Sequence, residues 1–204
     1  MKRTFLALSL FVILCCPLSI GAQSLDPQRW RFQFSAGMPQ HPKSPGWFFN
    51  FPQSPGHVNY VFTGYRRGLE GHTLTMAIAI QILSGAPKFN YLDKTGDCDT
   101  PATVRPYFTT GNMDDQFGRW WSYPTGIELQ AGIFEIAIPF TPDRWSSVYG
   151  KFGDYSPYTL KKFRQAITNA RSVGFTFGGG CNAGHGVRVK EGKARFLFLQ
   201  YQID

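Results

Sequence analysis

Short β-prone segments alternate with glycine- and proline-rich turns along most of the chain, and this pattern constrains the fold more than any other feature. The 204 residues include 22 glycines and 14 prolines, and aromatic residues make up 16%. Short strands between such turns are typical of an all-β sandwich or barrel. The segments that fit strands are 30–35, 58–65, 73–83, 104–109, 119–123, 133–140, 172–177, 186–189 and 194–203.

Two of these segments alternate strictly between apolar and other residues. The even positions from Phe134 to Phe140 are apolar, which indicates that this strand has one buried face. In the last segment the same period predicts that Phe196, Phe198 and Gln200 point one way. Arg195, Leu197, Leu199 and Tyr201 would then point the other way.

Two further segments depart from the strand pattern. Ser156 and Pro157 suit a helix start, and an apolar stripe follows at spacings of three and four residues. We expect one short amphipathic helix there, closing an open end of the sandwich. Segment 37–55 is rich in proline and glycine, and it contains the aromatic run 47–51. We expect a long irregular loop whose aromatic residues pack inward or bind a partner.

The first 22 residues have the layout of a cleavable secretory signal. A basic pair at 2–3 precedes an apolar stretch at 5–16, and small residues follow at 21–22. A membrane-spanning helix needs about 20 apolar residues, so this stretch is too short to be one. We expect cleavage after Ala22, a single mature domain over 23–204, and a periplasmic or extracellular location.

Two cysteines, Cys98 and Cys181, remain after cleavage of the signal. An even pair in an oxidising compartment most simply forms a disulfide. Both lie in turn-rich sequence, so we expect the bridge to tie two loops at one edge of the domain. Metal ligation is the competing use, but two cysteines without a neighbouring histidine pattern make a poor zinc site. A lipoprotein signal fits less well, because neither Leu14 nor Cys15 is the small residue expected before a lipidated cysteine.

Positive charge is spread thinly over the mature chain. The net charge of +8 falls by two, to +6, when the two bases of the signal are removed. Mature basic residues are adjacent only at 66–67 and 161–162, whereas nucleic-acid-binding domains usually concentrate them in a stripe. We therefore expect no nucleic-acid partner. No later stretch is apolar enough to predict a transmembrane segment.

Recognised catalytic signatures are absent. The sequence contains no Gly-x-Ser-x-Gly elbow, no His-Glu-x-x-His and no phosphate loop. Glu135 is a lone strand carboxylate, whereas a glycosidase needs two facing carboxyls. We expect no cofactor, although a structural calcium ion stays open because aspartates are frequent in the loops. The loop aspartates Asp97, Asp99, Asp114 and Asp115 match no recognised calcium loop.

A set of arginine and aromatic residues forms the best candidate for a ligand-binding site. Arg105 and Tyr107 share one strand face, and Arg119 and Trp121 share a face on the next strand. His185 lies between two glycines, where the backbone can approach a ligand closely, although a histidine bonding its own turn is the plainer alternative. Aromatic rings stack on the C–H faces of sugars, and arginine donates to their hydroxyls, so this set predicts a sugar-binding face. Alternatively, the aromatics simply cover core.

The order of several segments resembles a known fold family. In order these are Val-Arg-Pro-Tyr-Phe (104–108), Arg-Trp-Trp-Ser (119–122), Ile-Pro-Phe (138–140), Val-Gly-Phe-Thr-Phe-Gly-Gly-Gly (173–180) and Ala-Arg-Phe-Leu-Phe-Leu-Gln-Tyr (194–201). The chain resembles the galactose-binding-like jelly roll of many carbohydrate-binding modules and of uncharacterised exported bacterial proteins. The resemblance implies a jelly-roll β-sandwich, and this fold family hosts binding modules, lyases and structural modules alike.

Three functions follow as expectations. The first is an exported, non-catalytic protein that binds a carbohydrate or a cell-envelope polymer. The second is a polysaccharide lyase or glycoside hydrolase of jelly-roll type, for which Arg105, Tyr107 and His185 would be the candidates. The third is a structural or protein-interaction module that uses the aromatic run at 47–51.

Overall fold

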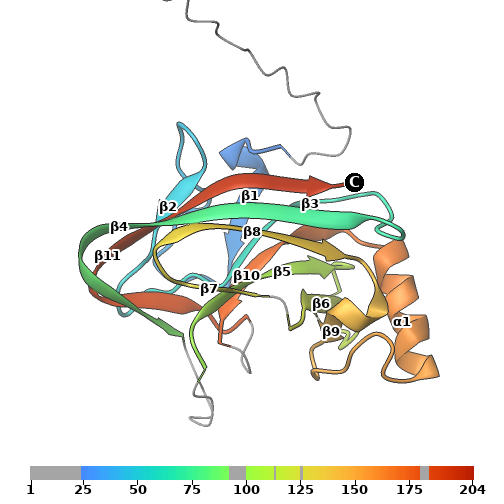
Figure 1. Cartoon of the computed structure of the whole chain (residues 1–204). Coiled ribbons are helices and arrows are strands. Elements are labelled where there is room, and N and C mark those ends of the chain that lie inside the picture. The colour runs from blue at the N-terminus through green and yellow to red at the C-terminus, as the bar shows by residue number, and fades with distance from the viewer. Residues whose placement is uncertain (1–23, 92–99, 113, 125, 180–183) are drawn as a thin grey trace, which may run out of the picture.

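The computed structural model describes residues 24–91, 100–112, 114–124, 126–179 and 184–204. Within these ranges the chain forms two antiparallel sheets that face each other, with one short α-helix (Figure 1). The expected all-β sandwich with a single helix is therefore confirmed. The seven-stranded sheet has the order β1-β3-β10-β5-β6-β9, with β7 paired to β5, and the four-stranded sheet has the order β2-β11-β4-β8.

The bounds of these elements are as follows. The larger sheet contains β1 (Trp30–Gln33), β3 (Tyr60–Gly64), β5 (Thr103–Thr109), β6 (Arg119–Ser122), β7 (Ile127–Glu128), β9 (Trp145–Ser147) and β10 (Ser172–Gly178). The smaller sheet contains β2 (Phe48–Asn50), β4 (Thr73–Tyr91), β8 (Gly132–Pro139) and β11 (Val187–Ile203). The helices are η1 (Pro27–Arg29), η2 (Pro142–Arg144) and α1 (Pro157–Thr168).

Aromatic rings fill the space between the two sheets. Phe175 of the larger sheet stacks on Phe196 of the smaller one at 5.3 Å between ring centroids, and Phe49 stacks on the same ring at 5.1 Å. Trp30 and Trp47 meet edge to face at 5.7 Å. Large rings with such contacts bury much apolar area, so this layer supplies most of the hydrophobic stabilisation of the fold.

The aromatic segment around β2 belongs to this core. Trp47, Phe49 and Phe51 are all at most 5% exposed. The expectation of a wholly irregular loop is wrong here, because the run pairs with β11 through Phe48 opposite Leu197. Of the two roles predicted for these aromatics, packing inward is the one observed, and the surface contact expected for a protein-interaction module is not formed by these three rings.

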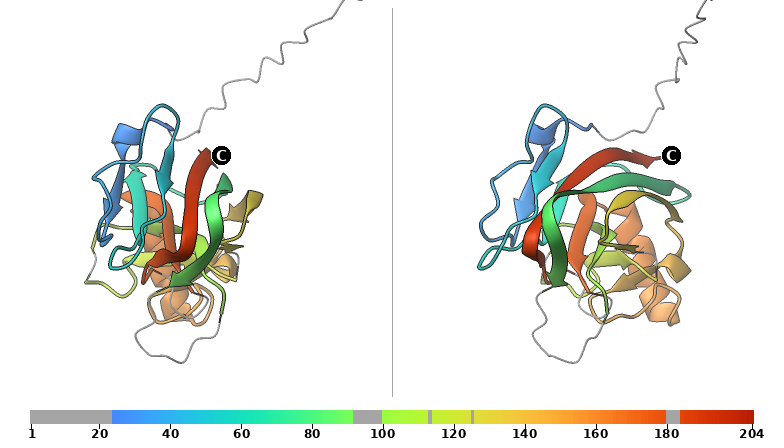
Figure 2. Two further views of the ribbon diagram at one scale, coloured as in Figure 1. Left: turned by 90° about the vertical axis from the view of Figure 1, so that its left-hand side faces the viewer. Right: turned by 60° about the vertical axis from the view of Figure 1, so that its left-hand side comes forward.

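Strands β4 and β11 form a long antiparallel pair that curls over at the end of the sandwich opposite α1 (Figure 1, Figure 2). The sequence prediction ended the first strand at Leu83 and split the second into two. Both strands instead continue through an irregularity at Gly85 and Gly192, where positive φ angles let the backbones approach closely.

A second irregularity in β11 overturns the predicted alternation. The register shifts between Phe198 and Gln200, so Tyr201 turns inward with Phe198. Tyr201 is 1% exposed, and its hydroxyl donates to the Gly174 carbonyl at 3.1 Å. The strict period-two prediction for Gln200 and Tyr201 is therefore wrong, because one extra residue reverses the faces.

Helix α1 closes one end of the sandwich, as predicted (Figure 1). Ser156 caps it: the Ser156 hydroxyl accepts from the Thr159 amide, and the Thr159 side chain accepts from the Ser156 amide. Phe163 is 1% exposed and meets Trp120 edge to face at 5.0 Å.

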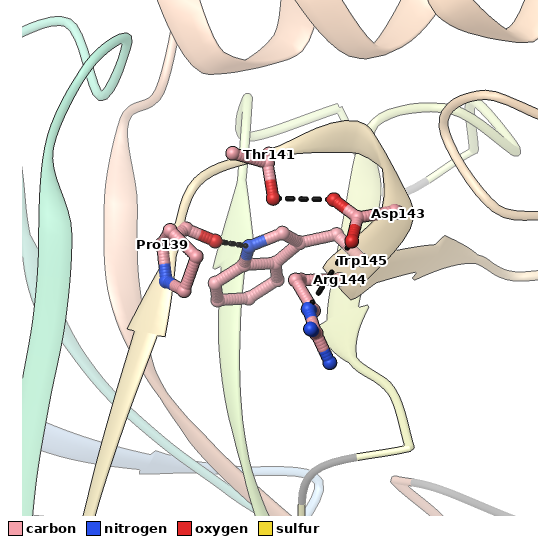
Figure 3. Close-up of polar contacts among 5 residues, drawn as sticks. All are labelled: Pro139, Thr141, Asp143, Arg144 and Trp145. Atoms are coloured by element: carbon pink, nitrogen blue, oxygen red, sulfur yellow. Dashed lines mark hydrogen bonds and ion pairs between the residues drawn. The ribbon is translucent and has the colours of Figure 1, made fainter.

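The turn after β8 carries the chain from the smaller sheet to the larger one at this same end (Figure 3). The Trp145 indole donates to the Pro139 carbonyl at 2.9 Å, and Asp143 accepts from Thr141 and pairs with Arg144 at 3.2 Å. Trp145 is thereby fixed against Phe140, on which it stacks at 4.9 Å.

Several predictions concern residues outside those described. These are the secretory signal at 1–22 and the Cys98–Cys181 disulfide. In the described part of the chain, no helix is long and apolar enough to cross a membrane.

Candidate ligand-binding face

The strand registers place the predicted arginine and aromatic residues on one side of the larger sheet. Val104 and Phe108 of β5 enter the core, so Arg105 and Tyr107 point to the outer side. Tyr107 lies opposite Trp121, and Thr109 lies opposite Arg119. The predicted sharing of strand faces is therefore observed. We call this outer surface the arginine–aromatic face, made up of Phe34, Tyr60, Arg105, Tyr107, Arg119, Trp121, Tyr123 and Thr176.

Three aromatic rings form the centre of this face. Tyr107 contacts Tyr60 at 5.1 Å and Trp121 at 5.6 Å between ring centroids. Although they point away from the core, Tyr60, Tyr107 and Trp121 are only 5%, 2% and 7% exposed. Tyr107 and Trp121 therefore do not form the walls of an open groove.

The segment just before β11, at Gly184, lies directly against two of these rings. A Cβ atom placed on Gly184 would be 2.5 Å from the Tyr60 hydroxyl oxygen and 3.5 Å from the Trp121 indole nitrogen. Gly184 also has a φ of +76°, which glycine adopts without strain. His185 follows at once and is half-buried. His185 therefore follows a glycine that lies close to the aromatic cluster, and the predicted role of His185 toward a ligand stays a prediction.

Each arginine of the face lies over an aromatic ring. Arg105 is 6% exposed, and its guanidinium carbon lies 5.3 Å from the centroid of Tyr123. Its Nη1 donates to the carbonyls of Ser122 and Pro124 at 3.2 and 3.4 Å. Burial lowers the pKa of Arg105, because the charged form loses hydration. The guanidinium nevertheless stays charged at any ordinary pH.

Arg119 lies beside the central cluster of Tyr60, Tyr107 and Trp121. Its guanidinium carbon lies 5.9 Å from the centroid of Trp121, and its positive charge partly offsets the burial that raises the pKa of Tyr60. Arg119 is half-buried, so part of its side chain remains in contact with solvent. This arginine side chain therefore extends from the buried rings to the solvent-accessible surface.

Several buried polar atoms on the face have no hydrogen-bond partner among the described residues. They are Arg105 Nε, Arg119 Nε, Trp121 Nε1 and Thr176 Oγ1. A buried donor or acceptor left without a partner costs about 1–3 kcal/mol, so such groups are uncommon and require a reason. Their concentration beside two arginines gives this face unused hydrogen-bonding capacity.

Burial raises the pKa of Tyr107 and also of Tyr60, and the nearby positive charge of Arg119 opposes this only in part. A phenol that acts as a base in a lyase needs the opposite shift, toward neutral pH. Tyr107 is therefore held in its protonated form, which does not fit the base that the enzymatic alternative would assign to it.

Among the residues that the structure covers, no group of three side chains is arranged to hold a metal ion. Asp115 instead stabilises its own loop, since one carboxylate oxygen accepts from the Phe117 amide at 2.8 Å. Asn112 accepts from the amides of Asp114 and Asp115 in the same loop. Asp97 and Asp99 lie outside the described ranges.

Sequence reasoning missed three members of the face. Phe34, Tyr60 and Thr176 reach it because β3 lies between β1 and β10, an order that no sequence pattern indicates. Tyr123 continues the alternation of Arg119 and Trp121, so the period of two already predicted its direction.

Comparison with protein-family models and with curated proteins finds no match for this chain. The functional conclusion therefore rests on the geometry of the face.

Proposed function

We propose that this protein is a non-catalytic carbohydrate-binding protein, and that its ligand contacts the arginine–aromatic face. The partnerless donors beside Arg105 and Arg119 are the observation that carries the proposal. Sugar hydroxyls accept from such donors once the covering side chains are displaced, and aromatic rings complement the apolar faces of sugars. The export and the envelope location expected from the sequence fit a partner met outside the cytoplasm.

Two exposed rings at the edges of the face offer the stacking surface that the buried centre does not. Tyr123 is 40% exposed beneath Arg105, and Phe34 is 58% exposed with its ring edge on Tyr60 at 5.9 Å. Tyr60, Thr176 and Arg105 form one row across the sheet between these rings, so a sugar chain that contacts both rings would follow this row.

The backbone at Phe34 supports this assignment. Its φ of +50° is a strained conformation for a bulky residue. Hydrogen bonds hold the turn in place: His57 Nε2 contacts the Phe34 carbonyl at 3.0 Å, and the Asn59 amide donates to the Ser35 hydroxyl at 2.8 Å. Strain of this kind is concentrated at binding and active sites, where the fold holds a side chain in a required position.

The test is retention on a panel of neutral and anionic polysaccharides by affinity electrophoresis. We expect retention by at least one polymer and its loss in Phe34→Ala and Tyr123→Ala. Tyr158→Ala is the matched control, since Tyr158 of α1 is 57% exposed and also has a cation, Lys162, over its ring at 5.7 Å. Folded protein that no polymer retains, or equal loss in all three variants, contradicts the proposal.

A further inference from the structure

Within the described ranges, the arginines of the arginine–aromatic face have no carboxylate partner. In the described ranges, the ion pairs are Lys88–Glu191 at 2.7 Å and Arg144–Asp143 at 3.2 Å, and both lie in exposed positions. Neither Arg105 nor Arg119 pairs with a carboxylate there. Buried arginines are rare unless they are paired.

Among the described residues, the hydrogen-bond partners of Arg105 are neutral. Two backbone carbonyls accept from Nη1, and Nε has no acceptor. Arg119 likewise has a buried Nε with no acceptor among the described residues. Guanidinium groups match carboxylate and sulfate oxygens by two parallel N–H donors, and such bonds are stronger than bonds to neutral groups.

The two arginines start from well-separated positions along the strand direction. Arg119 lies opposite Thr109, four positions along β5 from Arg105, which corresponds to about 13 Å between backbone positions. The Tyr107–Trp121 pair lies between them. A chain with repeated negative groups can contact the half-buried Arg119 and pass over the buried Arg105, while its sugar rings cross the aromatic rim.

We propose that the ligand of the arginine–aromatic face is an anionic polysaccharide, with a carboxylate or sulfate group directed at Arg119 and a further one directed at Arg105. This inference rests on the proposed carbohydrate-binding function. It specifies that the ligand is negatively charged and polymeric, and that Arg119 and Arg105 attract its negative groups.

The experiment uses two matched pairs of polymers and one matched pair of variants. Polygalacturonate is compared with its methyl ester, and dextran sulfate with dextran, so that only the negative group changes and the two anion types are told apart. Arg119→Gln is compared with Arg195→Gln. Arg195 is an arginine on the other sheet that also lies over a ring, Phe48, at 4.4 Å, and its Nε donates to Asn50.

We expect at least one charged polymer to bind about tenfold or more tightly than its neutral partner, and Arg119→Gln to remove most of that difference. Arg119→Lys keeps the charge but loses the paired donors, so its affinity should be intermediate. Arg195→Gln should bind like the parent protein. Thermal unfolding of each variant establishes that it is folded.

Other results overturn the inference in distinguishable ways. Equal binding of the charged and neutral polymers shows that the face does not select its ligand by charge. The proposed carbohydrate-binding function is then still supported. Equal losses in Arg119→Gln and Arg195→Gln show that attraction comes from net charge alone, since the chain is basic. If no polymer of either kind binds, the inference falls together with the proposed function.

Discussion

The outer faces of the two sheets contain the same kinds of residue in opposite states. On the arginine–aromatic face, Arg105 is 6% exposed and its Nε has no partner. On the outer face of the smaller sheet, Arg195 is partly accessible, lies over Phe48, and donates through Nε to Asn50 at 3.0 Å. On the arginine–aromatic face the arginine Nε has no partner among the described residues, whereas on the smaller sheet a neighbouring side chain accepts from it.

Apolar residues show the same contrast. An apolar row, Phe48, Leu197, Ala79 and Ile133, crosses all four strands of the smaller sheet, and Ile133 is 78% exposed. On the larger sheet, by contrast, the outward Tyr107 and Trp121 are covered. An outward direction in a strand therefore does not determine exposure, because loops can cover one face and leave the other open.

The largest expected effect compares two adjacent tryptophans that point to opposite sides of β6. Trp120→Ala removes a ring that is 0% exposed in the core between the sheets and should cost about 3–5 kcal/mol in free energy of unfolding. Trp121→Ala should cost clearly less, because fewer packed elements surround the outer face. Urea denaturation measures both, and equal losses would show that the outer face is a second core.

Gly184 and Gly71 form the next comparison, because both have a φ of +76°. A Cβ on Gly71 meets nothing within 4 Å, whereas one on Gly184 meets the Tyr60 hydroxyl at 2.5 Å. Each change to alanine should cost about 1 kcal/mol from the backbone alone. Gly184→Ala should cost about 1–3 kcal/mol more, from steric overlap in a packed region. Equal thermal shifts would contradict the close packing over Tyr60.

The buried tyrosines predict a dependence of stability on alkaline pH. Because burial raises the pKa values of Tyr60 and Tyr107, the folded state retains protons that the unfolded state releases above about pH 10. Stability should be unaffected by these groups below that pH and should fall as pH rises beyond it. Tyr107→Phe should reduce the slope of unfolding free energy against pH. An unchanged slope would mean that Tyr107 titrates as an exposed phenol does.

The smallest expected effect lies on the open face. Ile133→Ser should change the free energy of unfolding by no more than about 0.5 kcal/mol, because the side chain is 78% exposed. It should also leave polysaccharide retention unchanged. A large loss of stability in denaturant titration would show that this face is covered in solution.

The sequence predicted the fold class, the position of α1 and the direction of the side chains in β5 and β6, because these follow from local periodicity. It missed the register shift that turns Tyr201 inward and the continuity of β11, since both depend on pairing with β4. It also missed Tyr60 and Phe34 as neighbours of Trp121. Their approach depends on the order of strands in the sheet, and residues far apart in sequence set that order.

The most direct test of the carbohydrate-binding face follows the tryptophan indole N–H resonances by NMR during titration with a short oligogalacturonate. Trp47 and Trp121 both have a buried indole nitrogen without a partner, but Trp47 lies in the core and Trp121 on the face. Tryptophan-to-phenylalanine variants assign the signals. We expect the Trp121 resonance to shift and those of Trp47 and Trp120 to stay unchanged. A shift that excludes Trp121, or equal shifts of all three, would contradict it.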